Sequence, residues 1–285
     1  MFRLKKLLLP VDFSERSTSA ARYARPLASR FESEVTMLHA LSHPSYEFNT
    51  ESFTPMPPGR SELAEDELDS FGAAELAGLR TRRLVILGDP SVAIVDYTRH
   101  EKVDLIVMPT HGYGPFRRFI LGSTTAKVLH DAECPVLTGT HLEEIPDRDT
   151  IHYNNVVCAV DLGPNSLGAL RWAAEFAAVF ESRLFLVHAI PALAEAEGDY
   201  YQTDPISPLP AAGLQQLAAL QNEAGTHAVP IVVGGEIVKA ISRQARELSA
   251  DLMVIGRSTS GAIFGRLRTQ AYGLIRESPC PVVSI

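Results

Sequence analysis

The sequence repeats itself once, and this internal repeat constrains the fold more than any other feature. Pro10-Val11-Asp12 recurs as Ala159-Val160-Asp161, 149 positions later, and Cys134-Pro135-Val136 recurs as Cys280-Pro281-Val282, 146 positions later. Two further pairs lie between these in the same order: Leu38-His39-Ala40 with Val187-His188-Ala189, and residues 104–108 with residues 251–255. Four anchors in one order and at nearly constant spacing indicate two copies of one domain.

The length of the chain agrees with this division, because 285 residues are enough for two ordinary domains. We place the N-terminal domain at residues 1–145 and the C-terminal domain at residues 151–285. The segment between them, around Glu143–His152, is polar and contains Pro146, which favours a linker.

Each copy alternates short apolar segments with longer amphipathic ones. The apolar segments predict strands at residues 6–11, 35–41, 84–87, 103–108 and 136–138, and at residues 156–160, 184–188, 230–233, 252–255 and 282–285. Helices are predicted at residues 62–79, 90–101 and 124–130, after Ser14 as a cap, and around residues 237–248. Strands without polar alternation are typical of parallel sheets covered on both faces, so we expect an α/β fold in each copy.

The composition excludes several classes of partner. The net charge of −8 argues against a general binder of nucleic acid or of anionic membranes. No apolar run approaches the roughly 20 residues that a membrane span requires. The three cysteines form no Cys-x-x-Cys pair, which is typical of reduced thiols. We therefore expect a cytoplasmic protein without nucleic-acid or membrane partners.

One loop in the first copy is suited to binding an anion. It leads from the strand at residues 103–108 into a helix, and Gly112 and Gly122 allow its backbone to approach a ligand closely. The first N–H groups of that helix have no intrahelical acceptor, so they favour a phosphate, and Ser123 is a suitable cap. The loop lacks the G-x-G-x-x-G pattern, because Arg117 stands at the third glycine position, and no P-loop lysine precedes Ser123.

The spacing within this loop resembles that of the universal stress protein family. ATP-binding members carry G-x-x-G, nine residues, and then G-[S/T]; here nine residues separate Gly112 from Gly122-Ser123. Pro109 stands in place of the family's first glycine, and it has no N–H to donate and a fixed φ. The resemblance covers nearly the whole chain, twice. It implies two tandem Rossmann-like domains, each a five-stranded parallel sheet in the order 3-2-1-4-5, with the ligand beside strands 1 and 4.

The resemblance also implies which residues form a site for ATP, with or without Mg²⁺, in the first domain. Asp12 would contact ribose, adenine or Mg²⁺, or would instead cap the following helix together with Ser14. Ala40 and Met108 would line the adenine, although core packing explains these two equally well. Backbone N–H groups and hydroxyls at the last helix would hold the phosphates. The predicted nucleotide-binding residues are Pro10, Val11, Asp12, Ala40, Met108, Pro109, Gly112, Gly122, Ser123 and Thr124.

Other polar residues near the loop are expected to have simpler roles. His111 should form a local hydrogen bond, because no serine or cysteine nucleophile with an orienting carboxylate can be assigned beside it. His39 and His188 end equivalent strands and are expected to be structural. Arg117 and Arg118 can contact a phosphate but are more simply explained as solvated side chains. No group of Cys, His, Asp and Glu has metal-ligand spacing, so no metal site is predicted.

The second copy keeps Asp161 but loses much of the loop pattern. Thr259 stands where its second glycine belongs, and Arg268-Thr269 align with Gly122-Ser123. A branched residue and an arginine restrict the close backbone approach that a phosphate requires. We therefore predict a degenerate site that binds no ATP, with Arg268 in or across the phosphate position.

Together these features predict a tandem universal stress protein that binds ATP in its N-terminal domain and acts as a regulator in the stress response. At most slow hydrolysis is expected, since neither a general base nor a P-loop lysine is evident. The main alternative is a scaffold that binds no nucleotide and works through protein contacts. An enzyme of the adenine-nucleotide α-hydrolase type would need a second-substrate site that the sequence does not show. The final strands, 136–138 and 282–285, are candidates for self-association into a dimer.

Overall fold

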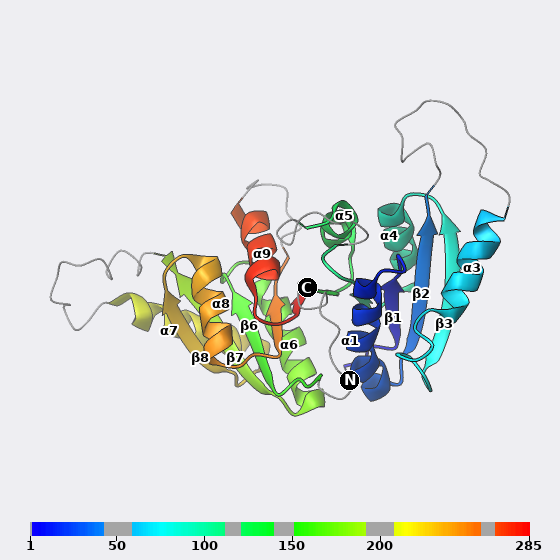
Figure 1. The fold of residues 1–285 in the computed structure, drawn as a ribbon. Coiled ribbons are helices and arrows are strands. Elements are labelled where there is room, and N and C mark those ends of the chain that lie inside the picture. The colour runs from blue at the N-terminus through cyan, green and yellow to red at the C-terminus, as the bar shows by residue number, and fades with distance from the viewer. Residues whose placement is uncertain (1, 43–58, 112–120, 140–150, 192–207, 258–265) are drawn as a thin grey trace. The chain divides into compact units, whose positions relative to one another are not determined.

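The computed structural model describes the chain except at its first residue and in five internal segments. The described residues are 2–42, 59–111, 121–139, 151–191, 208–257 and 266–285, with the side chains of 208 and 266–269 also left out. The chain divides into two compact units, Arg3–Ile151 and His152–Ile285. Each unit contains one parallel sheet covered by helices (Figure 1).

The first unit is built on five parallel strands. These are β1 (Lys6–Pro10), β2 (Glu34–Leu41), β3 (Arg80–Leu87), β4 (Leu105–Val107) and β5 (Val136–Thr138). They lie in the order β3-β2-β1-β4-β5. The direction in which strands are added therefore reverses between β1 and β4. Ligands of open α/β sheets bind at such a reversal, outside the carboxyl ends of the strands.

Four described helices connect these strands. They are α1 (Glu15–Phe31), α3 (Arg60–Ser70), α4 (Pro90–Glu101) and α5 (Ser123–Asp131). Right-handed crossovers place α1 and α3 on one face of the sheet and α4 and α5 on the other, where α4 and α5 pack against each other. The starts of α4 and α5 are thus brought to the same end of the sheet as the carboxyl ends of β1 and β4.

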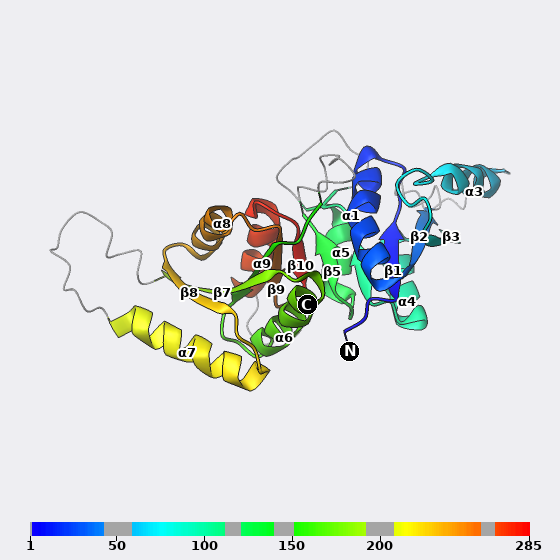
Figure 2. The same ribbon diagram turned by 90° about the horizontal axis from the view of Figure 1, so that it is seen from below.

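The second unit repeats this plan (Figure 2). Its strands are β6 (Asn155–Val160), β7 (Arg183–Ile190), β8 (Val229–Gly234), β9 (Leu252–Ile255) and β10 (Val282–Ser284), in the order β8-β7-β6-β9-β10. Its helices are α6 (Ser166–Phe180), α7 (Pro208–Ala224), α8 (Ile237–Glu247) and α9 (Arg266–Glu277). The pairings are again parallel throughout. The predicted α/β class with parallel sheets is confirmed in both units.

The central strands carry the hydrophobic core. Leu7, Leu8 and Leu9 of β1 are at most 1% exposed, and the three residues of β4 are fully buried. Burying one such side chain stabilises the folded state by about 1.5–3 kcal/mol. The loops at the carboxyl ends of these strands therefore begin from a rigid base. In the part of the chain that the structure describes, no helix combines the length and apolar character needed to cross a bilayer.

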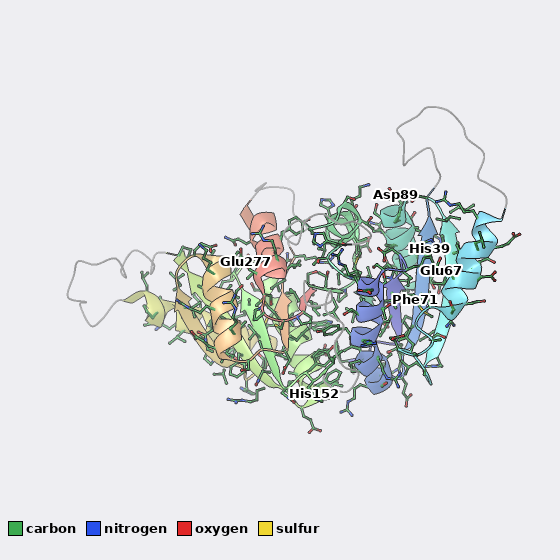
Figure 3. The ribbon with its side chains drawn as sticks, viewed as in Figure 1. His39, Glu67, Phe71, Asp89, His152 and Glu277 are labelled. Atoms are coloured by element: carbon green, nitrogen blue, oxygen red, sulfur yellow. The ribbon has the colours of Figure 1, made fainter. Side chains whose placement is uncertain are left out.

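The helix predicted over residues 62–79 is shorter in the structure. It ends at Ser70, and its last hydrogen bond runs from the Phe71 N–H to the Glu67 carbonyl at 3.0 Å. Figure 3 labels Glu67 and Phe71 at this end of the helix. Gly72 then has a φ of +66°, which a helix cannot contain. The chain continues in turns, and β3 begins four residues earlier than predicted.

The predicted helix caps are confirmed in two cases and wrong in one. The Ser14 side chain accepts a hydrogen bond from the Ser17 N–H at the start of α1. Asp89 caps α4, whose first residue is a proline as predicted. Ser123, in contrast, is the first helical residue of α5, and Gly122 is the N-cap. The α5 terminus consequently has no side chain of its own to satisfy it.

Candidate functional site

A cavity of about 580 Å³ lies at the carboxyl ends of β1, β2 and β4, beside the first residues of α4 and α5. Its lining includes nine of the ten residues predicted for the nucleotide site: Pro10, Val11, Asp12, Ala40, Met108, Pro109, Gly122, Ser123 and Thr124. The tenth, Gly112, lies outside the described residues, as do Arg117 and Arg118. The fold thus brings three distant parts of the sequence to one cavity.

Asp12 is held at the start of α1 through one of its two carboxylate oxygens. Oδ1 accepts hydrogen bonds from the Ser14 N–H at 3.1 Å and from the hydroxyls of Ser14 and Ser17 at 2.6 Å each. Oδ2 is buried and has no hydrogen-bond partner among the described residues. An unpaired buried oxygen costs free energy unless a ligand donor reaches it. One oxygen therefore orders the helix start, and the other remains to accept from a ligand.

The N-terminus of α5 presents backbone donors to the cavity. The first hydrogen bond within α5 runs from the Ala126 N–H to the Gly122 carbonyl at 2.8 Å, and no described side chain caps the helix. The N–H groups of Ser123, Thr124 and Thr125 therefore have no intrahelical acceptor. All three residues line the cavity. These N–H groups, together with the positive end of the helix dipole, can bind an anion.

Two other helices satisfy the same position with a carboxylate of their own. Asp89 accepts hydrogen bonds from the first N–H groups of α4 at 2.9 and 3.1 Å, and Glu236 accepts from those of α8 at 3.1 and 3.2 Å. The Ser91 hydroxyl, with these N–H groups, holds the pKa of Asp89 below its ordinary value of 3.8. Because the N-cap of α5 is a glycine, its N-terminus can accept an anionic group from a ligand.

Gly122 allows the α5 terminus to approach the chain that leaves β4. A Cβ atom at this position would lie 3.2 Å from the Thr110 carbonyl oxygen and 3.5 Å from the His111 Cα. The Gly122 N–H donates to that same carbonyl at 2.8 Å, and the Thr125 hydroxyl donates to the Pro109 carbonyl at 3.1 Å. The φ of Gly122 is −60°, so close approach and not an unusual backbone angle requires glycine here.

Eight residues that were not predicted as site residues also line the cavity. They are Ser17, Leu38, His39, Ser42, Pro90, Ile94, His111 and Thr125. Pro90 and Ile94 lie four positions apart and therefore on one face of α4, so helical spacing after the Asp89 cap was the signal for them. His39 and Thr125 immediately follow or precede predicted residues in the sequence, Leu38 lies two positions before Ala40 on β2, and the Ser17 hydroxyl donates to Asp12.

The histidines behave as expected from the sequence. The Nδ1 of His39 lies 2.8 Å from the Val11 carbonyl, and the Nδ1 of His188 lies 2.9 Å from the equivalent Val160 carbonyl. Each ring ties the end of one strand to its neighbour, so the structural role is confirmed in both units. His111 makes the expected local hydrogen bond, with Nδ1 3.0 Å from the Thr110 hydroxyl.

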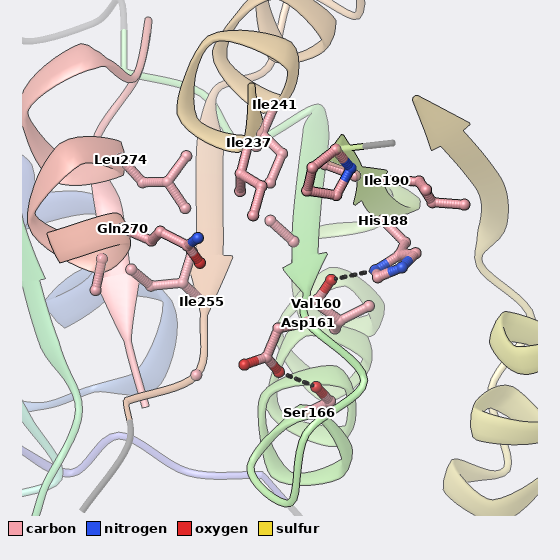
Figure 4. Close-up of a pocket in the computed structure, with 15 residues that line it drawn as sticks. Val160, Asp161, Ser166, His188, Ile190, Ile237, Ile241, Ile255, Gln270 and Leu274 are labelled. Atoms are coloured by element: carbon pink, nitrogen blue, oxygen red, sulfur yellow. Dashed lines mark hydrogen bonds between the residues drawn. The ribbon is translucent and has the colours of Figure 1, made fainter. Parts of the chain in front are cut away.

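The second unit has an equivalent cavity of about 300 Å³, at the ends of β6, β7 and β9 and beside α8 and α9 (Figure 4). Asp161 takes the place of Asp12, and its Oδ1 accepts hydrogen bonds from the Gly163 N–H at 2.8 Å and the Ser166 hydroxyl at 2.9 Å. Thr259 and the side chain of Arg268 lie outside the described part of the chain. The suggestion that Arg268 fills a phosphate position therefore stays a prediction.

Both halves of the chain are similar to the same group of known proteins. The model of the universal stress protein family matches residues 3–138 and again residues 152–285. Universal stress protein MJ0531 of Methanocaldococcus jannaschii is 32% identical over 143 residues, which cover 47% of this chain and 80% of that protein. The universal stress protein in the QAH/OAS sulfhydrylase 3′ region of Thermus aquaticus is 34% identical over 134 residues, covering 47% and 96%.

A solved structure is similar in fold over nearly the whole length of this chain. The crystal structure of a universal stress protein from Archaeoglobus fulgidus matches with a TM-score of 0.70, covering 99% of this chain and 96% of its own. The two sequences are 22% identical, so this likeness shows a common fold.

Proposed function

This chain belongs to the universal stress protein family, and from that premise we propose that its N-terminal domain binds ATP and thereby acts as a regulator in the stress response. The observation that carries this proposal is the start of α5, where three residues whose N–H groups have no intrahelical acceptor line a cavity of about 580 Å³. This volume lies within the range of about 300–1,000 Å³ that small-molecule sites occupy.

Each part of ATP has a counterpart in the cavity lining. Val11, Ala40 and Met108 offer apolar surface to the adenine. Asp12 Oδ2 accepts hydrogen bonds from the ribose hydroxyls. The hydroxyls of Ser123 and Thr124 join the α5 N–H groups in holding the phosphates. Where Mg²⁺ accompanies the phosphates, Asp12 is the candidate protein ligand, because it is the one carboxylate among the described lining residues.

The same lining supports binding more than turnover. Oδ1 of Asp12 is occupied by three hydrogen bonds from the protein, which leaves Oδ2 to accept from a ligand. The described lining residues also include no lysine or arginine to stabilise the charge that develops during phosphoryl transfer. In this proposal the hydrolysis of ATP is slow at most. The protein is cytoplasmic, and ATP binding shifts the equilibrium between its conformations.

Pro109 supports a second candidate function, that of a scaffold which binds no nucleotide. It stands where ATP-binding members of the family carry their first glycine, and it offers no N–H at the mouth of the site. Such a scaffold would act through protein contacts, with self-association through β5 and β10 as the candidate interface.

Mass spectrometry of the small molecules carried by the protein separates the two functions. The chain is purified without added nucleotide, denatured, and its released ligands are identified. ATP or another adenine nucleotide is expected from the wild type and not from Gly122→Arg. If no nucleotide is released and Mg-ATP does not raise the Tm of the wild type, the ATP proposal fails and the scaffold is favoured.

A further inference from the structure

A surface groove of the second unit combines three cationic side chains with a buried hydroxyl. It has a volume of about 370 Å³ and runs along α8 beside the end of α9, and we call it the α8 groove. Its lining includes Lys239, Ser242, Arg243 and Arg246 of α8, Glu236 at the α8 N-cap, and Glu277 at the end of α9. The described linings of this groove and of the cavity at the strand ends share no residue.

The three cations of the α8 groove lie on one face of the helix. Lys239, Arg243 and Arg246 are spaced by four and three positions, which makes them neighbours on the helix surface. All three residues are exposed, and none of their side chains forms an ion pair or a hydrogen bond with another described residue. Like charges at this spacing repel one another, so an anion in the groove would stabilise all three.

The two carboxylates of the α8 groove already have other partners. Both carboxylate oxygens of Glu236 accept hydrogen bonds from the first N–H groups of α8, at 3.1 and 3.2 Å. The Glu277 Oε1 lies 3.1 Å from a guanidinium nitrogen of Arg276. Neither carboxylate therefore neutralises the three cations, and the groove is locally electropositive although the whole chain carries a net charge of −8.

Ser242 adds a polar group that is already removed from water. It is 1% exposed, and its hydroxyl has no hydrogen-bond partner among the described residues. A buried hydroxyl without a partner costs free energy. Ser242 follows Lys239 by three positions and precedes Arg246 by four, so an anion held by these cations brings acceptor oxygens to the same face of the helix. The Ser242 hydroxyl can then donate to the ligand.

The first unit has a different arrangement on the equivalent helix. Residues 104–108 match residues 251–255, an offset of 147 positions, so α4 is the counterpart of α8. The counterparts of the three cations are Val92, Asp96 and Arg99. Arg99 is paired there, because its guanidinium lies 4.0 Å from Asp96 and 3.1 Å from Glu133. The stripe of cations is therefore a property of the second unit and is not required by the repeated fold.

The spacing of the donors indicates the kind of anion. Seven positions separate Lys239 from Arg246, which is about 10 Å along the helix axis. Linked phosphoryl groups present acceptor oxygens over more of this length than a single phosphate or carboxylate does. Guanidinium groups bind phosphoryl oxygens in pairs, and a lysine adds a point charge. The volume of about 370 Å³ is within the range for small-molecule sites.

We propose that the α8 groove binds a small molecule that carries two or more linked phosphoryl groups. Lys239, Arg243 and Arg246 neutralise its charge, and the Ser242 hydroxyl donates a hydrogen bond to one of its oxygens. This site is separate from the ATP site proposed for the first domain, so the C-terminal domain has a ligand site of its own at a helix surface.

NMR of the full chain, with pyrophosphate as the probe, tests this site directly. The titration is followed at the arginine Nε–H groups, at an ionic strength of about 0.15 M, which screens unspecific attraction between exposed charges. Pyrophosphate is expected to shift the signals of Arg243 and Arg246 in a saturable way and to leave the signal of Arg99 in place. Binding of pyrophosphate at the start of α5 would shift the backbone signals of Ser123 and Thr124, so the two sites are read separately.

Two variants and one control sharpen the test. Arg243→Gln should weaken pyrophosphate binding to the α8 groove at least tenfold, whereas Arg3→Gln, at an exposed position of the first unit, should leave it unchanged. Ser242→Ala should weaken binding at least threefold without lowering the Tm of the free chain, because the hydroxyl has no partner there. A lower Tm with unchanged affinity would instead show a purely structural serine and contradict its part in the site.

The wild-type titration decides even where a variant does not fold. The proposal is wrong if pyrophosphate shifts neither arginine of the α8 groove, or if it shifts Arg99 as strongly as Arg243. It is also wrong if a hexaglutamate peptide shifts the groove signals at a lower concentration than pyrophosphate, because the groove would then be a docking surface for an acidic protein segment.

Discussion

At the scale of single residues, the candidate site depends on what Gly122 lacks. Without a side chain, this residue neither caps α5 nor holds its terminus away from the Thr110 carbonyl, whose oxygen would lie 3.2 Å from an added Cβ. The next three residues line the cavity, and their N–H groups have no acceptor in their own helix.

Gly122→Arg is expected to weaken Mg-ATP binding by at least 100-fold, because the new side chain must displace the Thr110 carbonyl or occupy the phosphate position. Isothermal titration calorimetry measures the affinity, and thermal unfolding without ligand monitors the fold. Gly168→Arg is the matched control: it lies on the exposed surface of α6, and no atom lies within 4 Å of an added Cβ. Equal ATP affinity in the two variants would contradict this role of Gly122.

Much of the lining of the first cavity was predictable at the residue scale, and the differences have physical reasons. Gly122 and Thr124 follow from loop spacing, and Asp12 from its place at a strand end. Ser123 was predicted as the cap because serine is a good cap in general, but the Gly122 N–H donates to the Thr110 carbonyl and the helix starts one residue earlier, with Gly122 as its N-cap. Ile94 could not be assigned without knowing that α4 packs beside the first cavity.

At the scale of secondary-structure elements, α4 and α5 differ in how their N-termini are capped. Asp89 caps α4 with a carboxylate that accepts from two backbone N–H groups and the Ser91 hydroxyl. Those bonds lower the pKa of Asp89, so the cap stabilises the folded state fully above the ordinary value of 3.8. This contribution falls as the pH drops below 3.8 towards the lower pKa of the folded state.

Asp89→Ala is therefore expected to reduce the free energy of unfolding by about 1 kcal/mol at pH 7. The difference from the wild type should shrink at pH 3 and below, where protonation removes the charge of the cap in the wild type as well. Urea denaturation at the two pH values measures both effects. Asp96→Ala, on the same helix and 62% exposed at its side chain, should change stability by less than about 0.5 kcal/mol. An unchanged difference at low pH would contradict the capping argument.

An aromatic cluster fixes α6 in the second unit. Phe176 is 1% exposed, and its ring centroid lies 5.2 Å from that of Tyr153, 5.1 Å from Trp172 and 4.6 Å from Phe180. Phe176→Ala should lower the free energy of unfolding of the C-terminal domain by about 3–5 kcal/mol, because it leaves a cavity among these rings.

Chemical denaturation followed by tryptophan fluorescence can measure this loss, since Trp172 belongs to the cluster and is the single tryptophan of the chain. Glu175→Ala changes the neighbouring, exposed position and serves as the control. A loss of less than 1 kcal/mol in Phe176→Ala would show that the cluster relaxes around the gap.

The strands were more predictable than the helices, because most of them are short apolar runs that lie in the hydrophobic core. Apolar runs such as Leu105–Val107 have few alternatives to a buried strand, and these three residues are fully buried. The end of α3 depends on Gly72, whose φ of +66° stops the helix although the sequence on either side favours helix. The φ angle of one glycine depends on how the following residues pack, so the end of this helix could not be predicted from the sequence.

At the scale of the whole molecule, one domain plan occurs twice with two different cavities. Both units keep a strand-end aspartate and a histidine that ties neighbouring strands together. The first cavity is larger and is bordered by the uncapped start of α5, whereas the described lining of the second is mainly aliphatic. The repeat in the sequence predicted the duplication, but the aliphatic wall of the second cavity required the placement of α8 and α9.

Isothermal titration calorimetry of the full chain with Mg-ATP tests most directly whether the first domain is the nucleotide-binding one. The expected stoichiometry is one ATP per chain in the wild type and none in Gly122→Arg. Two ATP molecules per wild-type chain, or binding that survives in Gly122→Arg, would contradict the assignment of ATP to the α5 terminus.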